Sequence, residues 1–155
     1  MERWDKFFFT VMEAARAMSK DSSTKVGAII ASPDRRVISM GYNGLPRGVY
    51  DDDPSRDERP QKYLWYEHAE RNAIYNAREP LAGATIYVPW TPCADCARGI
   101  IQVGIKEVVM LYEHPARWAE SCDVSIIMFN EADVSWRYHY NETLPENHHE
   151  PYTLV

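Results

Sequence analysis

A histidine and a glutamate near one expected helix start, and two cysteines near another, constrain this chain more than any other feature. His68 and Glu70 stand in the stretch YEHAERNAI, and Cys93 and Cys96 follow Pro92 in the stretch WTPCADCARGI. The residues after each stretch have the spacing of an amphipathic helix, so both motifs are expected to open helices. Histidine, glutamate and cysteine are residue types that bind metals and transfer protons, so the function is expected to depend on these two helix starts.

Chain length and composition indicate one globular domain. The chain has 155 residues, of which 45% are hydrophobic and 26% are charged. These values are close to those of ordinary globular proteins and are enough for one packed core. We expect one domain over residues 1–138, followed by a polar tail over residues 139–155.

The charge and the N-terminus exclude several classes of protein. There are 17 Lys and Arg against 23 Asp and Glu, a formal net charge of −6, so long nucleic acid is not an expected partner. No apolar run approaches the ~20 residues of a membrane span, and MERWDKFFF lacks the basic start of a secretory signal. We expect a cytoplasmic protein whose main partner is a small molecule.

Hydrophobic periodicity predicts alternating helices and strands. The expected helices cover 4–19, 66–79, 94–104 and 118–129, and the expected strands cover 26–31, 36–42, 84–88, 107–111 and 134–138. The turn formers in SPDR make the first two strands an antiparallel hairpin, whereas strands separated by helices are expected to run parallel. The sequence therefore predicts an α/β domain with helices on both faces of a mixed sheet.

A long polar segment separates the hairpin from the histidine motif. Residues 45–62 are rich in charge and proline and are too many for a tight connection. Loops of this length inside a compact domain are usually functional or disordered. We expect this segment to be a substrate lid or part of an effector site.

The two cysteines and the histidine have the composition of a catalytic zinc site. Cys93 and Cys96 are three apart at a helix start, where the helix dipole favours thiolate, and His68 can add a nitrogen. Three protein ligands with one open position are typical of catalytic zinc, whereas structural sites use four. Cys122 lies in a stretch with helical periodicity and is expected to be a small buried apolar residue.

Glu70 is the candidate proton carrier. Zinc lowers the pKa of a bound water to roughly 7, and a nearby carboxylate can take its proton and pass it to a ring nitrogen and a leaving amine. This is the chemistry of hydrolytic deamination of an amino-substituted base. The alternatives are that Cys-x-x-Cys is structural and that Glu70 is a solvated charge in the first turn of a helix.

Taken together, HAE and PCADC resemble the signature of the zinc-dependent cytidine deaminase superfamily. The segments SKDSSTKVGAII, GYNGLPRG, HAERNAI, PCADCARGIIQVGI and EVV also occur in the order seen in deoxycytidylate (dCMP) deaminases, from about Trp4 to Val134. The resemblance implies a three-layer α/β/α fold with about five strands. It also implies a hydrolase that converts dCMP to dUMP and ammonia and so supplies thymidylate synthesis.

The resemblance also implies contacts to the base and the sugar. The backbone N–H of Ala69 would bind the base carbonyl, and Asn43 would contact the sugar, although Asn43 before Gly44 is also a common turn former. Some members pack an aromatic residue from beyond the fourth strand on the base. Here we expect Tyr112 to do so, with His114 farther along.

A 5′-phosphate needs cationic and hydroxyl donors at close quarters. Lys25, Ser23 and Ser22 in DSSTKVGA are the candidates, and Lys20 either shares this role or faces solvent.

The resemblance further implies a hexamer that is activated by dCTP and inhibited by dTTP, with Mg²⁺ accompanying the triphosphate. The effector site would include Gly41, Tyr42, Asn43 and Gly44. In the tail, His148 and His149 could bind a second metal, but solvent exposure is the simpler expectation.

Two other functions stay open at this point. The first is deamination of another cytosine or purine base, nucleoside or nucleotide by the same site. The second is a non-catalytic, zinc-stabilised module that binds nucleotides or a protein partner. The presence of Glu70 argues against the second, because a structural zinc needs no proton carrier.

Overall fold

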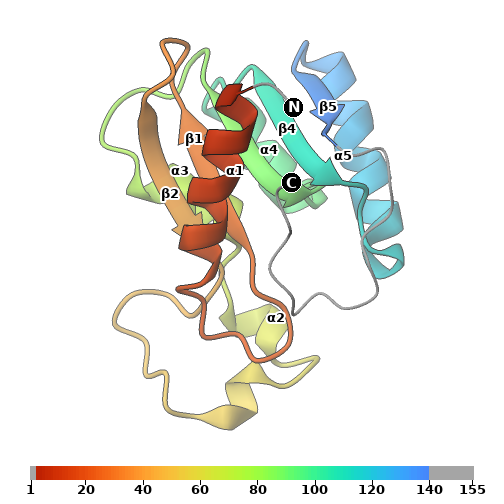
Figure 1. Cartoon of the computed structure of the whole chain (residues 1–155). Coiled ribbons are helices and arrows are strands. Elements are labelled where there is room, and N and C mark those ends of the chain that lie inside the picture. The colour runs from red at the N-terminus through yellow and green to blue at the C-terminus, as the bar shows by residue number, and fades with distance from the viewer. Residues whose placement is uncertain (1–2, 140–155) are drawn as a thin grey trace.

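The computed structural model describes residues 3–139 and is built around one mixed sheet (Figure 1). The strands are β1 (Gly27–Ala31), β2 (Val37–Tyr42), β3 (Thr85–Trp90), β4 (Glu107–Tyr112) and β5 (Ser135–Tyr138), in the spatial order β2-β1-β3-β4-β5. β1 runs antiparallel to β2 and to β3, whereas β3, β4 and β5 run parallel to one another. The predicted hairpin and the predicted mixed sheet are therefore confirmed.

Helices cover both faces of the sheet, as the strand pattern predicts. α1 (Arg3–Arg16) packs on one face, where Phe8, Phe9 and Met12 meet Ile29 and Leu111. α3 (Ala69–Asn76), α4 (Ala94–Gln102) and α5 (Ala119–Glu131) lie on the other face, and their buried side chains share a second core with the alternate residues of the strands. The result is a three-layer α/β/α arrangement.

Several element boundaries differ from those predicted. α1 ends at Arg16, not near Ser19, because the N–H groups of Met18 and Ser19 bond only three residues back, to the carbonyls of Ala15 and Arg16. Met18, which lies within the predicted helix but after its observed end, is 62% exposed. α3 begins at Ala69 and not at residue 66, since Glu67 pairs in an extended bridge with Gly44. α4 is predicted to reach residue 104 but ends at Gln102, and Gly104 follows with a φ of +80°, the left-handed conformation that commonly ends a helix.

The segment 45–62 is folded. It contains a 3₁₀ turn at Pro54–Asp57 and leads into the short helix α2 (Lys62–Trp65), which periodicity did not reveal. Figure 1 shows α2 at the end of the sheet where β1 begins and β2 ends. The tail candidates His148 and His149 lie outside the described residues. Between residues 3 and 139, no helix is long and apolar enough to cross a membrane.

Candidate active site

The histidine and cysteine motifs do open helices. His68 is the N-cap of α3 and Cys93 is the N-cap of α4, both with extended backbone. Glu67 holds the entry to α3, because its carboxylate accepts from the N–H of His68 (2.9 Å) and from Nε of Arg71 (2.7 Å). Both helices pack on the same face of the sheet, which brings their first turns together.

The three expected metal ligands form one cluster. Nδ1 of His68 lies 3.4 Å from Sγ of Cys93 and 3.4 Å from Sγ of Cys96, and the three atoms lie within 4.8 Å of one another. Tetrahedral zinc with Zn–S near 2.3 Å and Zn–N near 2.0 Å separates its ligand atoms by roughly 3.6–3.8 Å. Within residues 3–139, no other group of three such side chains meets the geometry of a metal site. The distances and the two-sulfur, one-nitrogen donor set fit zinc.

The electrostatics of the cluster also fit a cation. A hydrogen bond from Cys96, acting against burial and helped by His68, lowers the pKa of Cys93 to about 4. The same hydrogen bond, together with burial, raises the pKa of Cys96 well above its ordinary value. Burial works to lower the pKa of His68, but its bond to Cys93 and the nearby negative charges leave it raised. The second cysteine therefore ionises only if a cation offsets the added charge.

Glu70 is buried beside these ligands. Glu70 is 5% exposed, and its Oε2 lies 3.5 Å from Sγ of Cys96. Burial, opposed by the charge of His68, raises the pKa of this carboxyl group. Glu70 is thus not a solvated helix charge, and a raised pKa suits a group that must both accept and release a proton near neutral pH.

A single pocket reaches from this cluster to the segment that ends in α2. Its lining comprises Asp21, Thr24, Val26, Asn43, Arg59, Lys62, Tyr63, Tyr66, His68, Ala69, Glu70, Trp90, Thr91, Cys93, Arg117, Trp118 and Cys122. Ala69 is the first residue of α3, so its N–H has no partner within the helix and can serve a ligand. The pocket thus brings Asn43 and Cys93, which are distant in sequence, together with His68, Ala69 and Glu70.

Trp118, which the sequence pattern did not indicate, contacts the histidine of the cluster. Its ring centroid lies 6.1 Å from that of His68, nearly perpendicular, and 5.9 Å from that of Tyr63. Tyr112, the expected residue, does not line the pocket; it packs against the core on the α1 face of the sheet. His114 also lies outside the lining, and its Nδ1 is 3.2 Å from the carbonyl of Pro115.

None of the candidate phosphate donors is among the residues that line this pocket. Lys25 is half-buried and does not line the pocket. The hydroxyl of Ser22 donates to Asp57, that of Ser23 accepts from Lys62 at 2.7 Å, and Lys20 pairs with Asp51 on the surface at 2.5 Å.

The cationic side chains that do line the pocket are Arg59, Lys62 and Arg117. No signal in the sequence singled them out, because Arg59 and Lys62 lie in the long polar segment and Arg117 follows a proline-bounded turn.

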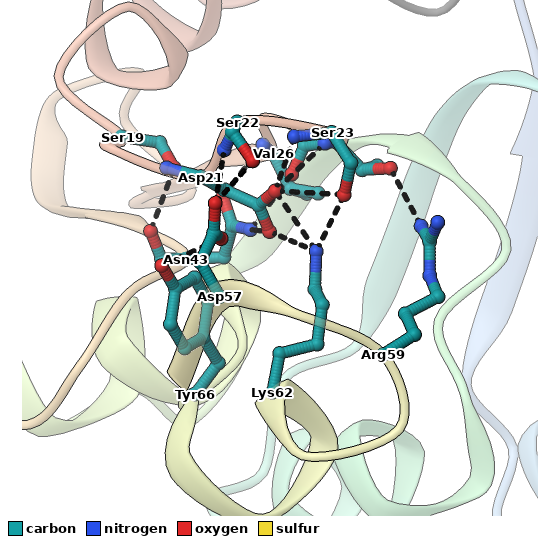
Figure 2. A network of polar contacts seen from close by, with 11 residues as sticks. Ser19, Asp21, Ser22, Ser23, Val26, Asn43, Asp57, Arg59, Lys62 and Tyr66 are labelled. Carbon is teal, nitrogen blue, oxygen red and sulfur yellow. Dashed lines mark hydrogen bonds and ion pairs between the residues drawn. The ribbon is translucent and has the colours of Figure 1, made fainter. Parts of the chain in front are cut away.

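Of the four GYNG residues, the first packs against a helix and the other three line a pocket. Gly41 sits against α3, where a side chain would collide with the backbone of Ala69 and Ala73. Tyr42, Asn43 and Gly44 line a second pocket, together with residues of the long segment. Asn43 lines both pockets, and Figure 2 shows it inside a network of polar contacts.

Comparison with known proteins agrees with this site. The family model of the cytidine and deoxycytidylate deaminase zinc-binding region matches residues 1–112. An uncharacterised deaminase from the region 3′ of luxG in Aliivibrio fischeri is 43% identical over 141 residues, which cover 88% of this chain and 95% of that protein. Human deoxycytidylate deaminase is 34% identical over 140 residues, covering 86% and 78%.

Solved structures agree on the fold. The dCMP deaminase of cyanophage S-TIM5, in complex with dCMP and dUMP, superposes with a TM-score of 0.72 at 22% identity and covers 89% of this chain and 98% of its own. The three-layer fold implied by the resemblance is therefore confirmed. With its family match, its curated relatives and its His68–Cys93–Cys96 cluster, the chain belongs to the cytidine and deoxycytidylate deaminase family of zinc-dependent enzymes.

Proposed function

We propose that this enzyme hydrolyses dCMP to dUMP and ammonia and so supplies dUMP for thymidylate synthesis. The observation that carries the proposal is the burial of Glu70 against the His68–Cys93–Cys96 cluster, in a pocket that Arg59 and Arg117 also line. The human relative is a deoxycytidylate deaminase, and the structural neighbour from the cyanophage contains dCMP and dUMP.

Glu70 would carry protons in this reaction. His68, Cys93 and Cys96 would hold a zinc ion, which when bound would lower the pKa of a water to roughly 7. Glu70 would accept one proton of the attacking water as its oxygen bonds to C4 of cytosine, and would deliver that proton to ring nitrogen N3. As the C4–N bond breaks, Glu70 would pass the second proton, from the new hydroxyl at C4, to the departing amine, which leaves as ammonia while C4 becomes a carbonyl. The raised pKa of Glu70 suits both transfers.

The helix start and an aromatic side chain would hold the base. The free N–H of Ala69 would donate to the carbonyl at C2 of cytosine. We assign packing against the base to Trp118 in place of Tyr112, because Trp118 lines the pocket next to His68 and Tyr112 does not. An aromatic ring at this position gives apolar contact to the base without fixing its hydrogen bonds.

The arginines of the pocket would bind the 5′-phosphate. Lys62 is paired with Asp21, so Arg59 and Arg117 are the remaining cations of the lining; Nη2 of Arg59 donates to the hydroxyl of Thr24 at 3.2 Å. Burial and the charge of Arg59 lower the pKa of Arg117, and the charges of Tyr63 and Asp21 offset this only in part. A dianion between the two guanidinium groups would relieve their repulsion. Lys25, Ser22 and Ser23 are the alternative donors.

Regulation would use the second pocket. Its lining combines Tyr42, Asn43 and Gly44 with cations and with a run of carboxylates, including Asp51, Asp52 and Asp53. This mixture suits a nucleoside triphosphate carrying Mg²⁺, such as dCTP as activator or dTTP as inhibitor, in a hexamer. Gly41 does not line this pocket. Cooperative kinetics that respond to dCTP, dTTP and Mg²⁺ would support the proposal, and hyperbolic kinetics unaffected by both nucleotides would contradict it.

A substrate panel tests the proposed reaction. Deamination of dCMP, CMP, dCTP, cytidine and guanine is followed by absorbance with the zinc-loaded enzyme. We expect dCMP to have the highest kcat/KM. Preference for another base would favour a different deaminase, and no turnover would favour a non-catalytic nucleotide-binding module. We place the enzyme in the cytoplasm, where Cys93 and Cys96 would stay reduced.

A further inference from the structure

A buried ion pair forms part of the wall of the pocket. Lys62 of α2 donates to both carboxylate oxygens of Asp21, at 2.8 and 2.7 Å, and to the hydroxyl of Ser23 at 2.7 Å (Figure 2). The side chains of Lys62 and Asp21 are 7% and 1% exposed. Both groups also lie within the lining of the pocket, so the pair is close to the substrate as well as inaccessible to bulk water.

Asp21 in turn helps to fix the orientation of the side-chain amide of Asn43. The amide nitrogen of Asn43 donates one hydrogen to Asp21 Oδ2 (3.0 Å) and the other to the carbonyl of Thr24 (2.8 Å). Its oxygen accepts from the N–H of Val26 at 2.8 Å. The opposite orientation of this amide would place its NH₂ against the N–H of Val26 and its oxygen against a carboxylate, so the network allows one orientation only.

This arrangement restricts what Asn43 can offer to a ligand. Both of its hydrogens are used inside the protein, and the second lone pair of Oδ1 is the capacity that is left. Asn43 can therefore accept a hydrogen bond from a ligand but cannot donate one. Phosphate and carbonyl oxygens need donors, so Asn43 is suited to a hydroxyl group. The one free hydroxyl of dCMP is the 3′-OH of its sugar.

Lys62 supports the charge on which this orientation depends. Burial alone would raise the pKa of Asp21, but Lys62 and the N–H groups of Thr24 and Ser23 leave it lowered, so the carboxylate is ionised at neutral pH. Without Lys62, a buried carboxylate would have no counter-charge and would take up a proton or move. A protonated Asp21 would no longer hold Asn43 as a pure acceptor.

We infer that Lys62 is a positioning residue that, through Asp21, fixes Asn43 as the acceptor for the 3′-hydroxyl of the nucleotide. This inference rests on the proposed function, since it assumes a nucleotide substrate. It assigns to the first residue of α2 an indirect part in sugar recognition, which the position of Lys62 in sequence, 41 residues from Asp21, does not suggest.

The test compares dCMP with 2′,3′-dideoxycytidine monophosphate, which lacks the 3′-hydroxyl. The zinc-loaded parent should prefer dCMP by roughly tenfold in kcat/KM, the value of one good hydrogen bond. In Lys62→Met, this preference ratio should fall toward one, with most of the change in KM for dCMP. Lys62→Arg, which keeps the charge, should restore part of the ratio. Lys106→Met, which changes an exposed lysine outside the pocket lining, should keep the full ratio.

Each outcome decides between the possible roles. A folded, zinc-loaded Lys62→Met variant that loses activity equally on both nucleotides would show that Lys62 is only structural. A parent that does not distinguish the two nucleotides would overturn the role of Asn43. If Lys62→Met does not fold, the double variant Asp21→Asn/Lys62→Met should fold, because it leaves no uncompensated buried charge. Its preference for dCMP over the dideoxy nucleotide should be near one. A double variant that kept the preference of the parent would overturn the inference. A parent inactive on dCMP would instead defeat the proposed function.

Discussion

Gly41 of β2 lies in backbone contact with the first turns of α3. A Cβ atom at Gly41 would stand 2.2 Å from the carbonyl oxygen of Ala69 and 2.3 Å from the backbone nitrogen of Ala73. Real Cβ atoms do not approach so closely, so the strand and the helix touch only because residue 41 has no side chain. The contact fixes the depth at which α3 presents Ala69 and Glu70 to the pocket.

Gly41→Ala should therefore damage both stability and the site. We expect the free energy of unfolding to fall by about 1–3 kcal/mol, the usual cost of overpacking, and kcat to fall because α3 must shift. Gly44→Ala is the matched control, since its Cβ meets nothing within 4 Å; its effect should stay within about 0.5 kcal/mol. Urea unfolding of the three proteins gives the comparison, and equal effects of the two substitutions would contradict the packing role.

Metal content tests the ligand cluster. Purified protein should contain about one zinc per chain. Cys93→Ala should lose it, because two remaining ligands bind zinc weakly, whereas Cys122→Ala should keep it, since Sγ of Cys122 is 3.3 Å from the carbonyl of Thr91 and is not part of the cluster. Elemental analysis after gel filtration measures both. Full zinc in the Cys93→Ala variant would refute the ligand assignment.

Arg117→Gln tests phosphate recognition. Loss of a charge-assisted contact costs about 1.5–3 kcal/mol, so kcat/KM for dCMP should fall by roughly one to two decades. Activity on deoxycytidine, which has no phosphate, should change far less. Lys25→Gln is the comparison variant, because Lys25 does not line the pocket. If only Lys25→Gln lowered kcat/KM for dCMP, phosphate binding would instead be assigned to the donors in DSSTKVGA.

The ion pair of Asp5 and Arg137 should give a pH-dependent part of the stability. Burial would raise the pKa of Asp5, but hydrogen bonds from Arg137, at 2.8 Å to each oxygen, and from Tyr87 leave it lowered. A lowered folded-state pKa stabilises the protein above the unfolded value near 3.9, and this contribution is lost as the pH falls through the folded value. At pH 7, Asp5→Asn should cost about 1–3 kcal/mol, a range that allows for the partial exposure of Arg137.

Urea unfolding at a series of pH values measures this effect. The difference between the parent and Asp5→Asn should be constant near neutrality and should close below about pH 4. Acid loss of zinc affects both proteins alike, so the difference between them isolates Asp5. A gap that does not depend on pH would show that the carboxylate charge is not what stabilises the pair.

The sequence predicted those parts of the site that follow from local pattern. Helix periodicity and motif spacing are local, so they placed His68 and Cys93 at helix starts, and the structure has both there. Trp118 could not be found in this way, because its proximity to His68 depends on how α5 packs against α4.

Lys62 was missed for a similar reason. Its buried pairing with Asp21 joins two polar segments that have no periodicity, and a charge run in sequence does not reveal which charge folds inward. Tyr112 was chosen from its place at a strand end, but it packs against the core on the α1 face, together with Leu111. Strict alternation after Leu111 would place it on the other face, so the local pattern of β4 does not predict this position.

Glu70→Gln is the decisive test of the mechanism. Glutamine has almost the same shape as glutamate and can fill the same buried position, so the fold and the zinc content should be retained. Because one group would serve the water, the ring nitrogen and the leaving amine, we expect turnover of dCMP to fall by about 10⁴-fold, the upper end for general acid–base catalysis. This corresponds to about 5.5 kcal/mol of activation free energy, more than a shift from an isosteric change should produce. Single-turnover assays with measured zinc content decide the matter: a variant within tenfold of the parent would mean that Glu70, although buried 3.5 Å from Cys96, is not the proton carrier.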